Sequence, residues 1–544
     1  MFITQEKWLG ENRAITPALL PDGAGVVSLN HKPTRGDLRP WRAPLTVATV
    51  PAGQQTIYRM GRDVISDVNY WLSWPSVVHA VRGFDVADTT ERTYYTGDGI
   101  PKVTDNIMAL GSPPYPTSWR PLGLPVPAVA LSVSAPASTD ATALKGTYFY
   151  LYTYANDWGW ESAPSAPSAK ITRTSDVVTN LTNFIAPPAG NYGINRMRVY
   201  RTQQGAAGNG DYFFLREVPI GTTSTTDDNR LLAEQLTTTR WLTPPVDLVQ
   251  LTPMWNGMLA GISGGVGRMC VPYTPYAWPV AYDIKPPDSK VVGFGVFGQS
   301  MLVLTTGRPL LVAGSAPDAM DQRLLEIPQS CVSARSIVGM GIGVAWASPD
   351  GLCFYGPVGL YGSMNAKVVT RGIFTRDDWQ AIRPETIIGQ MYEGLYMGSY
   401  DDGSGARKGF LMDMGNTSGV YMLDAAYTAL HFDNLADSLF VLQGTNIGKW
   451  DAGTPMTVTF TSKRFYLPKP TQAFSCAEVV ALAYPVAISF SADGVTYYST
   501  NAVNNNGFRL PGGFYAQIWQ FSVNTTGAVQ IVSLAHSMAE LAQA

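Results

Sequence analysis

The sequence predicts an all-β protein, and three observations lead to that prediction. Short apolar and aromatic runs of about five residues recur along the chain, with turn residues about every eight to twelve positions. The 544 residues include 53 glycines and 39 prolines, which supply the turns. Aromatic residues make up 11% and charged residues only 15%, a balance that argues against disorder. A chain of this length should divide into about three or four domains.

Composition also bounds the function. The formal net charge of −3 gives no general attraction to nucleic acid. The four cysteines are widely spaced without a CxxC pair, and the four histidines do not cluster with them, which favours buried free thiols over disulfides or zinc. The first residues, MFITQEKWLGEN, lack a secretory signal pattern, and no run is long enough for a transmembrane helix. We therefore expect no metal, no cofactor and no membrane span, and assembly in a cytoplasm.

Residues 1–124 form the first predicted segment, a β-rich region that we expect to belong to the main fold. Short strands are predicted at residues 25–29, 54–58, 79–83 and 93–96, the last followed by a Gly-Asp-Gly turn. Six prolines between residues 113 and 127 mark a linker or an extended edge. The first boundary therefore falls near residue 125.

Residues 125–246 form the second predicted segment. Residues 146–154, GTYFYLYTY, alternate as a strand does, with Tyr148, Tyr150, Tyr152 and Tyr154 on one face. Residues 195–201 and 211–218 form a further predicted hairpin. Together with the loop ESAPS at 161–165 and the Thr-Thr-Asp at 225–227, this pattern resembles a fibronectin type III domain. The resemblance implies a β-sandwich that serves as a binding or spacer module.

Two features of this segment are candidate contact sites. The loop that carries Trp158 and Trp160 is a candidate partner interface, because tryptophans in loops often anchor interfaces; the alternative is that they pack on the edge of the sandwich. Arg196, Arg198 and Arg201 are expected to form one solvent-exposed face of a strand, which we favour over a DNA-binding patch.

Residues 247–455 form the third predicted segment, an irregular β-propeller. Asn256-Gly257 is a strong two-residue hairpin signal. Two short strands, 341–347 and 352–355, flank the turn Ser348-Pro-Asp-Gly351. Residues 375–381 form the best short helix, with an acidic first turn. A loose recurrence of about 40 to 50 residues favours a degenerate propeller over a strict repeat array. Residues 456–544 are a further β-rich section, either a closing blade or a small sandwich.

The search for catalytic residues finds none that forms a convincing set. The turn at residues 491–497 is similar to the Asp-box of sialidase-type propellers but lacks one residue, and a structural turn explains it. The chain has no GxSxG, HExxH or Walker pattern. The acidic residues of the propeller segment occur as adjacent pairs or at loop tips, as solvated surface charge does: Asp377, Asp378, Asp401, Asp402, Asp433 and Asp437. On these grounds we expect a protein that is not an enzyme.

A set of short motifs bears on function: Met254–Ala260, Ala277–Pro279, Thr305–Leu310, Cys331–Ile337 with the turn at Ser348–Gly351, and Leu534–Leu541. With the inserted fibronectin-like section, this set resembles the tail nozzle, or tail tubular protein B, class of short-tailed bacteriophages. The resemblance implies a structural virion protein that forms a ring, usually a hexamer, below the portal and adaptor. DNA would leave through the ring without sequence-specific binding, and tail fibres or spikes would be further partners. It also implies a place in the virion tail after assembly in the host bacterial cytoplasm.

Two other functions remain open at this stage. One is a carbohydrate-active propeller that degrades host polysaccharide, which requires suitably placed carboxylates. The other is a receptor-binding protein of the virion or cell surface, which would bind a glycan without turnover.

Overall fold

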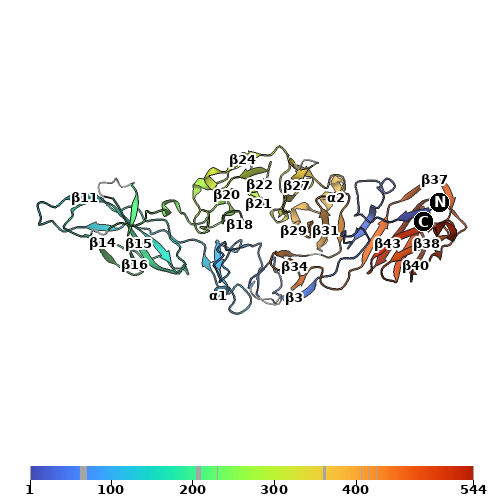
Figure 1. Ribbon diagram of the computed structural model, residues 1–544, viewed down its shortest axis with the longest axis horizontal. Helices are drawn as coiled ribbons and strands as arrows, with labels where there is room; N and C mark the ends of the chain where they lie inside the picture. Colours follow the sequence, from blue (N-terminus) through green and yellow to red (C-terminus); the bar gives the residue numbers. More distant parts are fainter. Residues whose placement is uncertain are drawn as a thin grey trace. The chain divides into compact units, whose positions relative to one another are not determined.

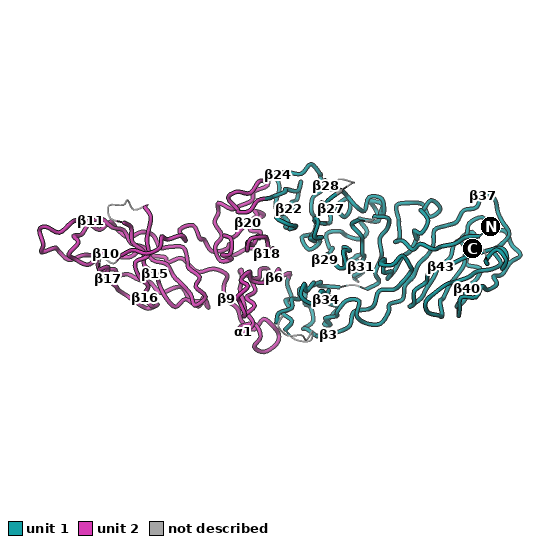
Figure 2. Tube along the Cα trace, in the orientation of Figure 1, with its two compact units in different colours: residues 1–76, 288–313, 322–544 teal, residues 77–287, 314–321 magenta. Residues whose placement is uncertain are grey.

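The computed structural model describes residues 2–61, 70–203, 210–228, 231–358, 363–405, 407–415, 417–425 and 427–542. Strands account for about 46% of the chain and helices for about 6%, which confirms the all-β prediction. The chain divides into two compact units, shown in Figure 2. Unit 1 comprises Met1–Ser76, Asp288–Ala313 and Gln322–Ala544, and unit 2 comprises Val77–Pro287 and Gly314–Asp321. These units cut across the four segments proposed from the sequence, whose boundaries stay predictions.

Unit 1 contains successive antiparallel meanders of the kind that form propeller blades. Two of them are four-stranded sheets in chain order, β21 (Val291–Phe297) to β24 (Asp321–Leu324) and β25 (Val338–Gly339) to β28 (Ser363–Val368). A third meander, β29 (Ile388–Tyr392) to β32 (Tyr421–Leu423), forms the first four strands of a larger sheet. A fourth sheet takes β33 (Ala429–Asp433), β34 (Ser438–Gln443) and β35 (Asn446–Lys449), and β3 (Leu45–Thr49) completes it. A two-stranded sheet pairs β4 (Thr56–Arg59) with β5 (Trp71–Trp74). The intervening strands are β22 (Ser300–Thr305), β23 (Leu310–Ala313), β26 (Val344–Ser348), β27 (Gly351–Val358), β30 (Leu395–Asp401) and β31 (Arg407–Asp413).

The contacts between sheets show a radial arrangement within unit 1. The first strand of each sheet contacts the first strand of the next: β21 contacts β25, β25 contacts β29, β29 contacts β33, and β33 contacts β4. These strands are therefore the inner strands of adjacent blades, as a propeller requires. The short helix α2 (Arg376–Ala381) and the single-turn segments η4 (Ala334–Ser336) and η5 (Pro384–Thr386) lie in the connections between blades. The predicted irregular propeller is thus confirmed as the fold class.

The hairpin β26–β27 shows why its sequence folds as a buried strand pair. All five residues of β26 are buried, because the strand is covered on both faces. Ala345 and Ala347 pack in one core, while Val344 and Trp346 pack in the neighbouring one. The predicted turn Ser348–Gly351 is present, but the first strand begins at Val344 rather than at residue 341. The difference follows from Gly341, which has a φ of +76° and therefore lies outside the strand.

The last part of unit 1 is a β-sandwich rather than a closing blade. One sheet runs β1 (Phe2–Gln5), β43 (Val529–Ala535), β38 (Cys476–Ala481) and β41 (Phe508–Arg509). The other contains β36 (Val458–Ser462), β37 (Phe465–Gln472), β39 (Val486–Ala492), β40 (Val495–Ala502) and β42 (Tyr515–Thr525). Both chain ends lie in this region, and the helix α3 (Met538–Leu541) follows β43 (Figure 1). The strand β2 (Gly25–Leu29) pairs with both β32 and β36, so one continuous sheet joins this sandwich to a blade.

Unit 2 contains two blade-like sheets and a separate sandwich. The first sheet is β6 (His79–Arg82), β7 (Thr93–Thr96), β8 (Lys102–Thr104) and β9 (Arg120–Pro121), with α1 (Asn106–Ala109) between the last two strands. The second is β18 (Val249–Pro253), β19 (Leu259–Ser263) and β20 (Val266–Met269). Asn256 and Gly257, with φ of 54° and 60°, form the predicted turn between β18 and β19.

The sandwich inserted between these two sheets agrees with the fibronectin-like prediction. Its strands are β10 (Ser132–Ser134), β11 (Lys145–Tyr148), β12 (Tyr150–Asn156), β13 (Ile171–Thr174), β14 (Thr179–Thr182), β15 (Ile194–Thr202), β16 (Tyr212–Pro219) and β17 (Ser224–Asp227). The predicted single strand at 146–154 is wrong in one respect, because it is divided between β11 and β12. These two strands pair with β13 and β15 in different sheets. Tyr150, Tyr152 and Tyr154 nevertheless share one core, as their alternation predicts.

The predicted solvent face of arginines is also corrected. Arg196 and Arg198 lie on one face of β15 and pair with Glu217, whereas Arg201 is only 8% exposed. The odd spacing between positions 198 and 201 places the third side chain on the opposite face of the strand. There Arg201 donates to the buried carboxylate of Asp227.

Candidate functional site

The tryptophan loop of unit 2 is held by contacts within that unit. Asn156 Oδ1 accepts hydrogen bonds from the backbone N–H groups of Trp158 (3.0 Å) and Trp160 (2.9 Å), which sets the shape of the loop. Trp160 is 6% exposed and stacks on Tyr276 with 4.7 Å between ring centroids. Half-buried Trp158 contacts Trp160 edge-on at 5.1 Å. Trp160 thus packs internally, and the partner interface at Trp158 and Trp160 stays a prediction.

Two guanidinium groups lie over the indole ring of Trp158 in this loop. Arg92 and Arg120 lie over Trp158 at 4.6 Å and 4.2 Å from its ring centre. Arg120 also forms a two-pronged ion pair with Asp157, at 2.5 and 2.9 Å, and holds the pKa of that carboxyl below its usual value. A partner that binds here would meet cations stacked on an indole ring rather than a bare apolar surface.

The residue after Trp160 belongs to a buried polar network. Glu161 accepts hydrogen bonds from Thr153 Oγ1 and Tyr200 OH, each at 2.6 Å, and from Arg198 Nη1 at 2.6 Å. Burial and the charge of Glu161 raise the pKa of Tyr200 well above its usual value. Every oxygen of this carboxylate is engaged, so its role is to hold the sandwich together.

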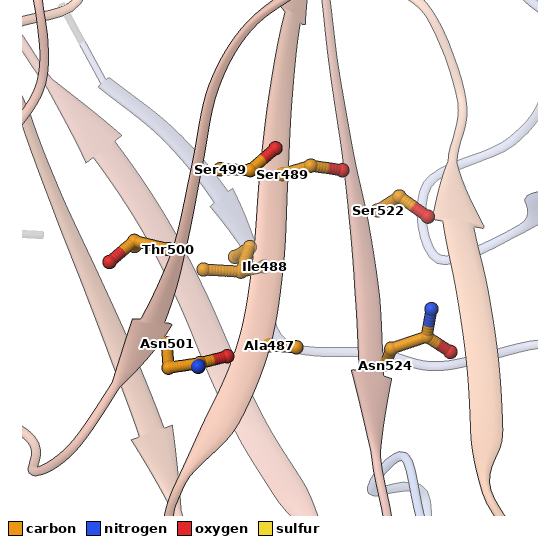
Figure 3. Close-up of a pocket in the computed structure, with 8 residues that line it drawn as sticks. All are labelled: Ala487, Ile488, Ser489, Ser499, Thr500, Asn501, Ser522 and Asn524. Atoms are coloured by element: carbon orange, nitrogen blue, oxygen red, sulfur yellow. The ribbon is translucent and has the colours of Figure 1, made fainter.

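A polar cavity of about 390 Å³ lies on the C-terminal sheet of unit 1 (Figure 3). Its lining residues come from β39, β40 and β42 and carry mostly hydroxyl and amide groups: Ala487, Ile488, Ser489, Ser499, Thr500, Asn501, Ser522 and Asn524. Strand register places Ser499, Ser489 and Ser522 in one row across the sheet. Asn501, Ala487 and Asn524 form the next row.

Hydroxyl groups of the adjacent strand β36 contact two of the lining residues. Thr461 Oγ1 and Ser522 Oγ are 2.9 Å apart, and Thr459 Oγ1 donates to Asn524 Oδ1 at 2.5 Å. None of the eight lining residues is charged or aromatic. The surface therefore suits a neutral ligand bound through hydrogen bonds. Sequence reasoning did not single it out, because the lining residues meet only when β39, β40 and β42 pair.

A second cavity, of about 410 Å³, lies beside β24, β27 and β28, also in unit 1. Its lining includes Arg323, Glu326, Tyr355 and Asn365. Burial raises the pKa of the Tyr355 phenol. The mixed charge and the apolar remainder of the lining point to no particular chemistry.

Several of the acidic residues that the sequence placed on the surface have local structural partners. Lys408 pairs with Asp402 at 2.7 Å and helps to hold the pKa of that carboxyl well below its usual value. Asp378 belongs to the capping box of α2. Asp433 is an exception to the predicted surface position, because it is fully buried and pairs with Arg59 at 2.8 Å.

The Asp-box-like turn also has a structural role. Asp493 Oδ1 accepts hydrogen bonds from the backbone N–H groups of Gln517 (3.0 Å) and Ile518 (2.8 Å). The side chain thus ties the β39–β40 turn to β42.

The described part of the chain holds no group of three or more His, Cys, Asp or Glu side chains placed to bind a metal ion. Cys270, Cys331, Cys353 and Cys476 are buried free thiols, as predicted. Burial raises the pKa of Cys270, Cys331 and Cys353 to about 12. No helix within the described ranges is both long and apolar enough to cross a bilayer.

Comparison with known proteins gives no family assignment. No protein-family model and no curated protein matches the sequence. Solved structures that align with the chain include PorZ, a surface component of the type IX secretion system of Porphyromonas gingivalis (11% identity, 86% of this chain and 77% of that one, TM-score 0.25). An arabinoxylan arabinofuranohydrolase of glycoside hydrolase family 43 from Bacillus subtilis aligns at 9% identity over 68% of this chain and 94% of that one, with a TM-score of 0.18. An exo-β-1,3-galactanase from Phanerochaete chrysosporium aligns at 8% identity over 91% and 99%, with a TM-score of 0.18.

These alignments correct one expectation from the sequence. The expectation that the protein is not an enzyme is contradicted, because two of the aligned structures are glycoside hydrolases. The three aligned structures are thus one bacterial surface component and two carbohydrate-active enzymes. At these identities and TM-scores the likeness transfers neither a substrate nor a catalytic residue to this chain.

Proposed function

We propose that this chain is a structural protein of a bacteriophage tail, the subunit of a ring-shaped nozzle through which the genome leaves the capsid. The observation that carries the proposal is the position of the motifs that resemble the tail nozzle class. The segment Cys331–Ile337 lies at a joint between blades, where Ser333 Oγ donates to the Ile387 carbonyl at 2.8 Å. Ser336 Oγ accepts from the Ala347 N–H at 2.9 Å, which ties the same segment to β26.

The other motifs are also structural. Ser348–Gly351 is the turn of the buried hairpin, and Trp278 Nε1 donates to the Pro275 carbonyl at 2.8 Å. Motifs that build joints and turns support a scaffold role. In such a role the chain would form a homo-oligomeric ring, with six subunits expected, and would bind the portal and adaptor proteins and the tail fibres or spikes. The net charge of −3 suits a conduit, because a basic lumen would retard the exit of DNA.

Electron microscopy of the purified full-length protein tests this proposal. We expect ring-shaped particles, formed either by the protein alone or after addition of the adaptor and portal proteins of the same virus. A protein that stays monomeric under both conditions, and that sediments as a monomer, would contradict the nozzle function.

The second candidate is a carbohydrate-active or receptor-binding protein of the virion. The polar cavity on β39, β40 and β42 favours the receptor-binding form, because its lining carries no carboxylate for glycoside hydrolysis. Hydroxyl and amide groups in register match the donors and acceptors of a neutral glycan. Incubation with capsular or lipopolysaccharide glycans from candidate hosts would distinguish turnover from binding. Release of reducing ends supports a carbohydrate-active protein, and retention on the glycan without release supports a receptor-binding protein. A matched variant, Asn524→Ala with Asn501→Ala, should abolish either activity if this cavity is the site.

A further inference from the structure

The segment Cys331–Ile337 contains an arginine that connects three blades of unit 1. Arg335 lies in η4, just before the inner strand β25. Its Nη2 donates to the carbonyl of Gln55 at 2.9 Å and to the carbonyl of Thr428 at 3.1 Å. Gln55 immediately precedes β4, and Thr428 immediately precedes β33. One guanidinium group therefore joins the starts of three inner strands, at one end of the propeller portion in unit 1.

A second arginine is held close to this junction. Arg407, the first residue of β31, donates from Nη2 to the carbonyls of Ser399 (2.8 Å) and Thr386 (3.1 Å), and from Nε to Ser399 Oγ (3.3 Å). Ser399 Oγ in turn donates to the carbonyl of Tyr427 at 2.8 Å, and Tyr427 is adjacent to Thr428, which binds Arg335.

Two further hydrogen bonds lock η4 against the blade that carries Arg407. Ser333 Oγ donates to the carbonyl of Ile387, the residue after Thr386, at 2.8 Å. The buried phenol of Tyr396 donates to the carbonyl of Ser336 at 2.9 Å. Arg335 and Arg407 are thus fixed in one junction by contacts on both sides.

The charge at this junction is not balanced by an ion pair. Within the described residues, neither Arg335 nor Arg407 has a carboxylate at ion-pair distance. The charge of Asp401 acts on Arg407, but the ion-pair contact of Asp401 is with Arg383 Nη1, at 3.9 Å. Burial, together with the charge of Arg407, lowers the pKa of Arg335 to about 10. Two partly buried like charges that repel each other favour a bound anion.

Each of the two arginines keeps N–H groups that its protein partners do not use. The hydrogen bonds of Arg335 all come from Nη2, and those of Arg407 come from Nε and Nη2. In the described part of the chain, Nε and Nη1 of Arg335 and Nη1 of Arg407 donate to no protein acceptor. The remaining N–H groups of a guanidinium held by its other side are suited to an oxyanion.

We propose that Arg335 and Arg407 form a binding site for a small tetrahedral oxyanion of the phosphate class at the junction of the blades. The anion would accept hydrogen bonds from the unused N–H groups and would offset the repulsion between the two guanidiniums. It would thereby stabilise the junction of the blades that begin with β4, β25, β29 and β33. This site is independent of the proposed function, because it requires neither a ring nor a glycan.

Binding of inorganic phosphate to the full chain, freed of phosphate by dialysis, tests the proposal. At constant ionic strength, phosphate should raise the melting temperature of the wild-type protein, whereas chloride should not. Calorimetric titration should give at least a tenfold weaker affinity for Arg335→Gln and for Arg407→Gln. Lys408→Gln is the matched control, because it removes a cation from the next position of β31 and should bind phosphate as the wild type does.

Two results would overturn the proposal. One is a wild-type melting temperature that responds equally to phosphate and chloride. The other is unchanged phosphate affinity in both arginine variants. If Arg335→Gln does not fold, Arg407→Lys decides: it keeps the charge but loses the planar fork, so a true site loses affinity while a merely electrostatic effect is retained. Ring formation is measured separately, so the failure of either proposal leaves the other to its own test.

Discussion

Two arginine clusters, one in each unit, use the charge of the guanidinium group in opposite ways. In the sandwich of unit 2, Arg173 and Arg201 both donate to Asp227 Oδ2, at 3.3 and 2.5 Å, and Tyr150 OH adds a third hydrogen bond at 2.8 Å. In unit 1, Arg335 and Arg407 donate instead to backbone carbonyls and to one serine hydroxyl. A carboxylate partner uses the charge of a guanidinium to hold a core together, whereas carbonyl partners position the group and leave its charge available.

The largest loss of stability is expected when the carboxylate of Asp227 in unit 2 is removed. Asp227→Asn leaves two buried guanidiniums without their shared anion, which should destabilise the sandwich by about 3 to 5 kcal/mol. Hydrogen exchange of the backbone amides of β12 and β15 measures this locally, which a global melting curve of a multi-domain chain does not.

The neighbouring Asp228 provides the control for this prediction. Its carboxylate is about half exposed and pairs with Arg216 at 3.2 Å. Asp228→Asn should therefore cost less than about 1 kcal/mol. If the β12 amides are equally protected from hydrogen exchange in Asp227→Asn and Asp228→Asn, the ion pairs of Asp227 do not stabilise the sandwich.

His31 in unit 1 sharpens the comparison, because burial disfavours the charged form of its imidazole more than Asp37 favours it. His31 is fully buried, with Nδ1 3.1 Å from Ser28 Oγ and Nε2 3.3 Å from the Asp37 carbonyl. Burial lowers the pKa of His31 to about 4, below its ordinary value of 6.5. Between these two pH values the unfolded state binds more protons than the folded state, so stability falls as the pH drops from 6.5 toward 4.

The expected loss from His31 alone is about 3 kcal/mol over that window, and none of it arises above pH 6.5. Denaturant unfolding is measured at pH 7, 6 and 5 with a signal from unit 1. From pH 7 to pH 5 the free energy of unfolding should decrease less for His31→Gln than for the wild type. The prediction fails if the free energy of unfolding changes with pH equally in His31→Gln and in the wild type.

The smallest expected loss of stability concerns the start of α2, where a carboxylate accepts a hydrogen bond from the backbone rather than from an arginine. Thr375 Oγ1 accepts from the Asp378 N–H at 3.1 Å, and the Asp378 side chain returns to the Thr375 backbone, which forms a capping box for α2. Thr375→Ala should cost about 1 kcal/mol. The Trp379 indole N–H donates to the Ser348 carbonyl at 2.9 Å, so its protection from hydrogen exchange measures the stability of α2. Asp377→Asn, in the same turn but outside the cap, should have a smaller effect; an equal effect would show that the capping hydrogen bond contributes no more than the charge of the first turn.

Several local features of the fold could be predicted from particular residues. Asn256-Gly257 and Ser348–Gly351 determine their turns because their backbone preferences act within four residues. Thr375 and Asp378 determine the start of α2 for the same reason. The alternation of Tyr150, Tyr152 and Tyr154 correctly predicted one shared core face.

The candidate sites were harder to predict because they depend on which distant segments meet. The tryptophans of the loop could be noticed, but not that Arg92 and Arg120 stack on Trp158. The break between β11 and β12 is set by two different pairing partners. Nothing in the segment Cys331–Ile337 indicates that Arg335 reaches Gln55, which lies 280 positions earlier in the chain.

The sequence by itself determined the all-β class, the turns, the short helix and the buried free thiols, because each depends on local backbone preference or on composition. The tertiary structure alone decided that β1 pairs with β43, that Arg201 faces a buried aspartate, and that Arg335 and Arg407 share one junction. These arrangements arise when the blades and sandwiches pack, since burial then selects which polar groups lie within hydrogen-bond distance. Periodicity along a strand gives the face on which a side chain lies, but not the segment that covers that face.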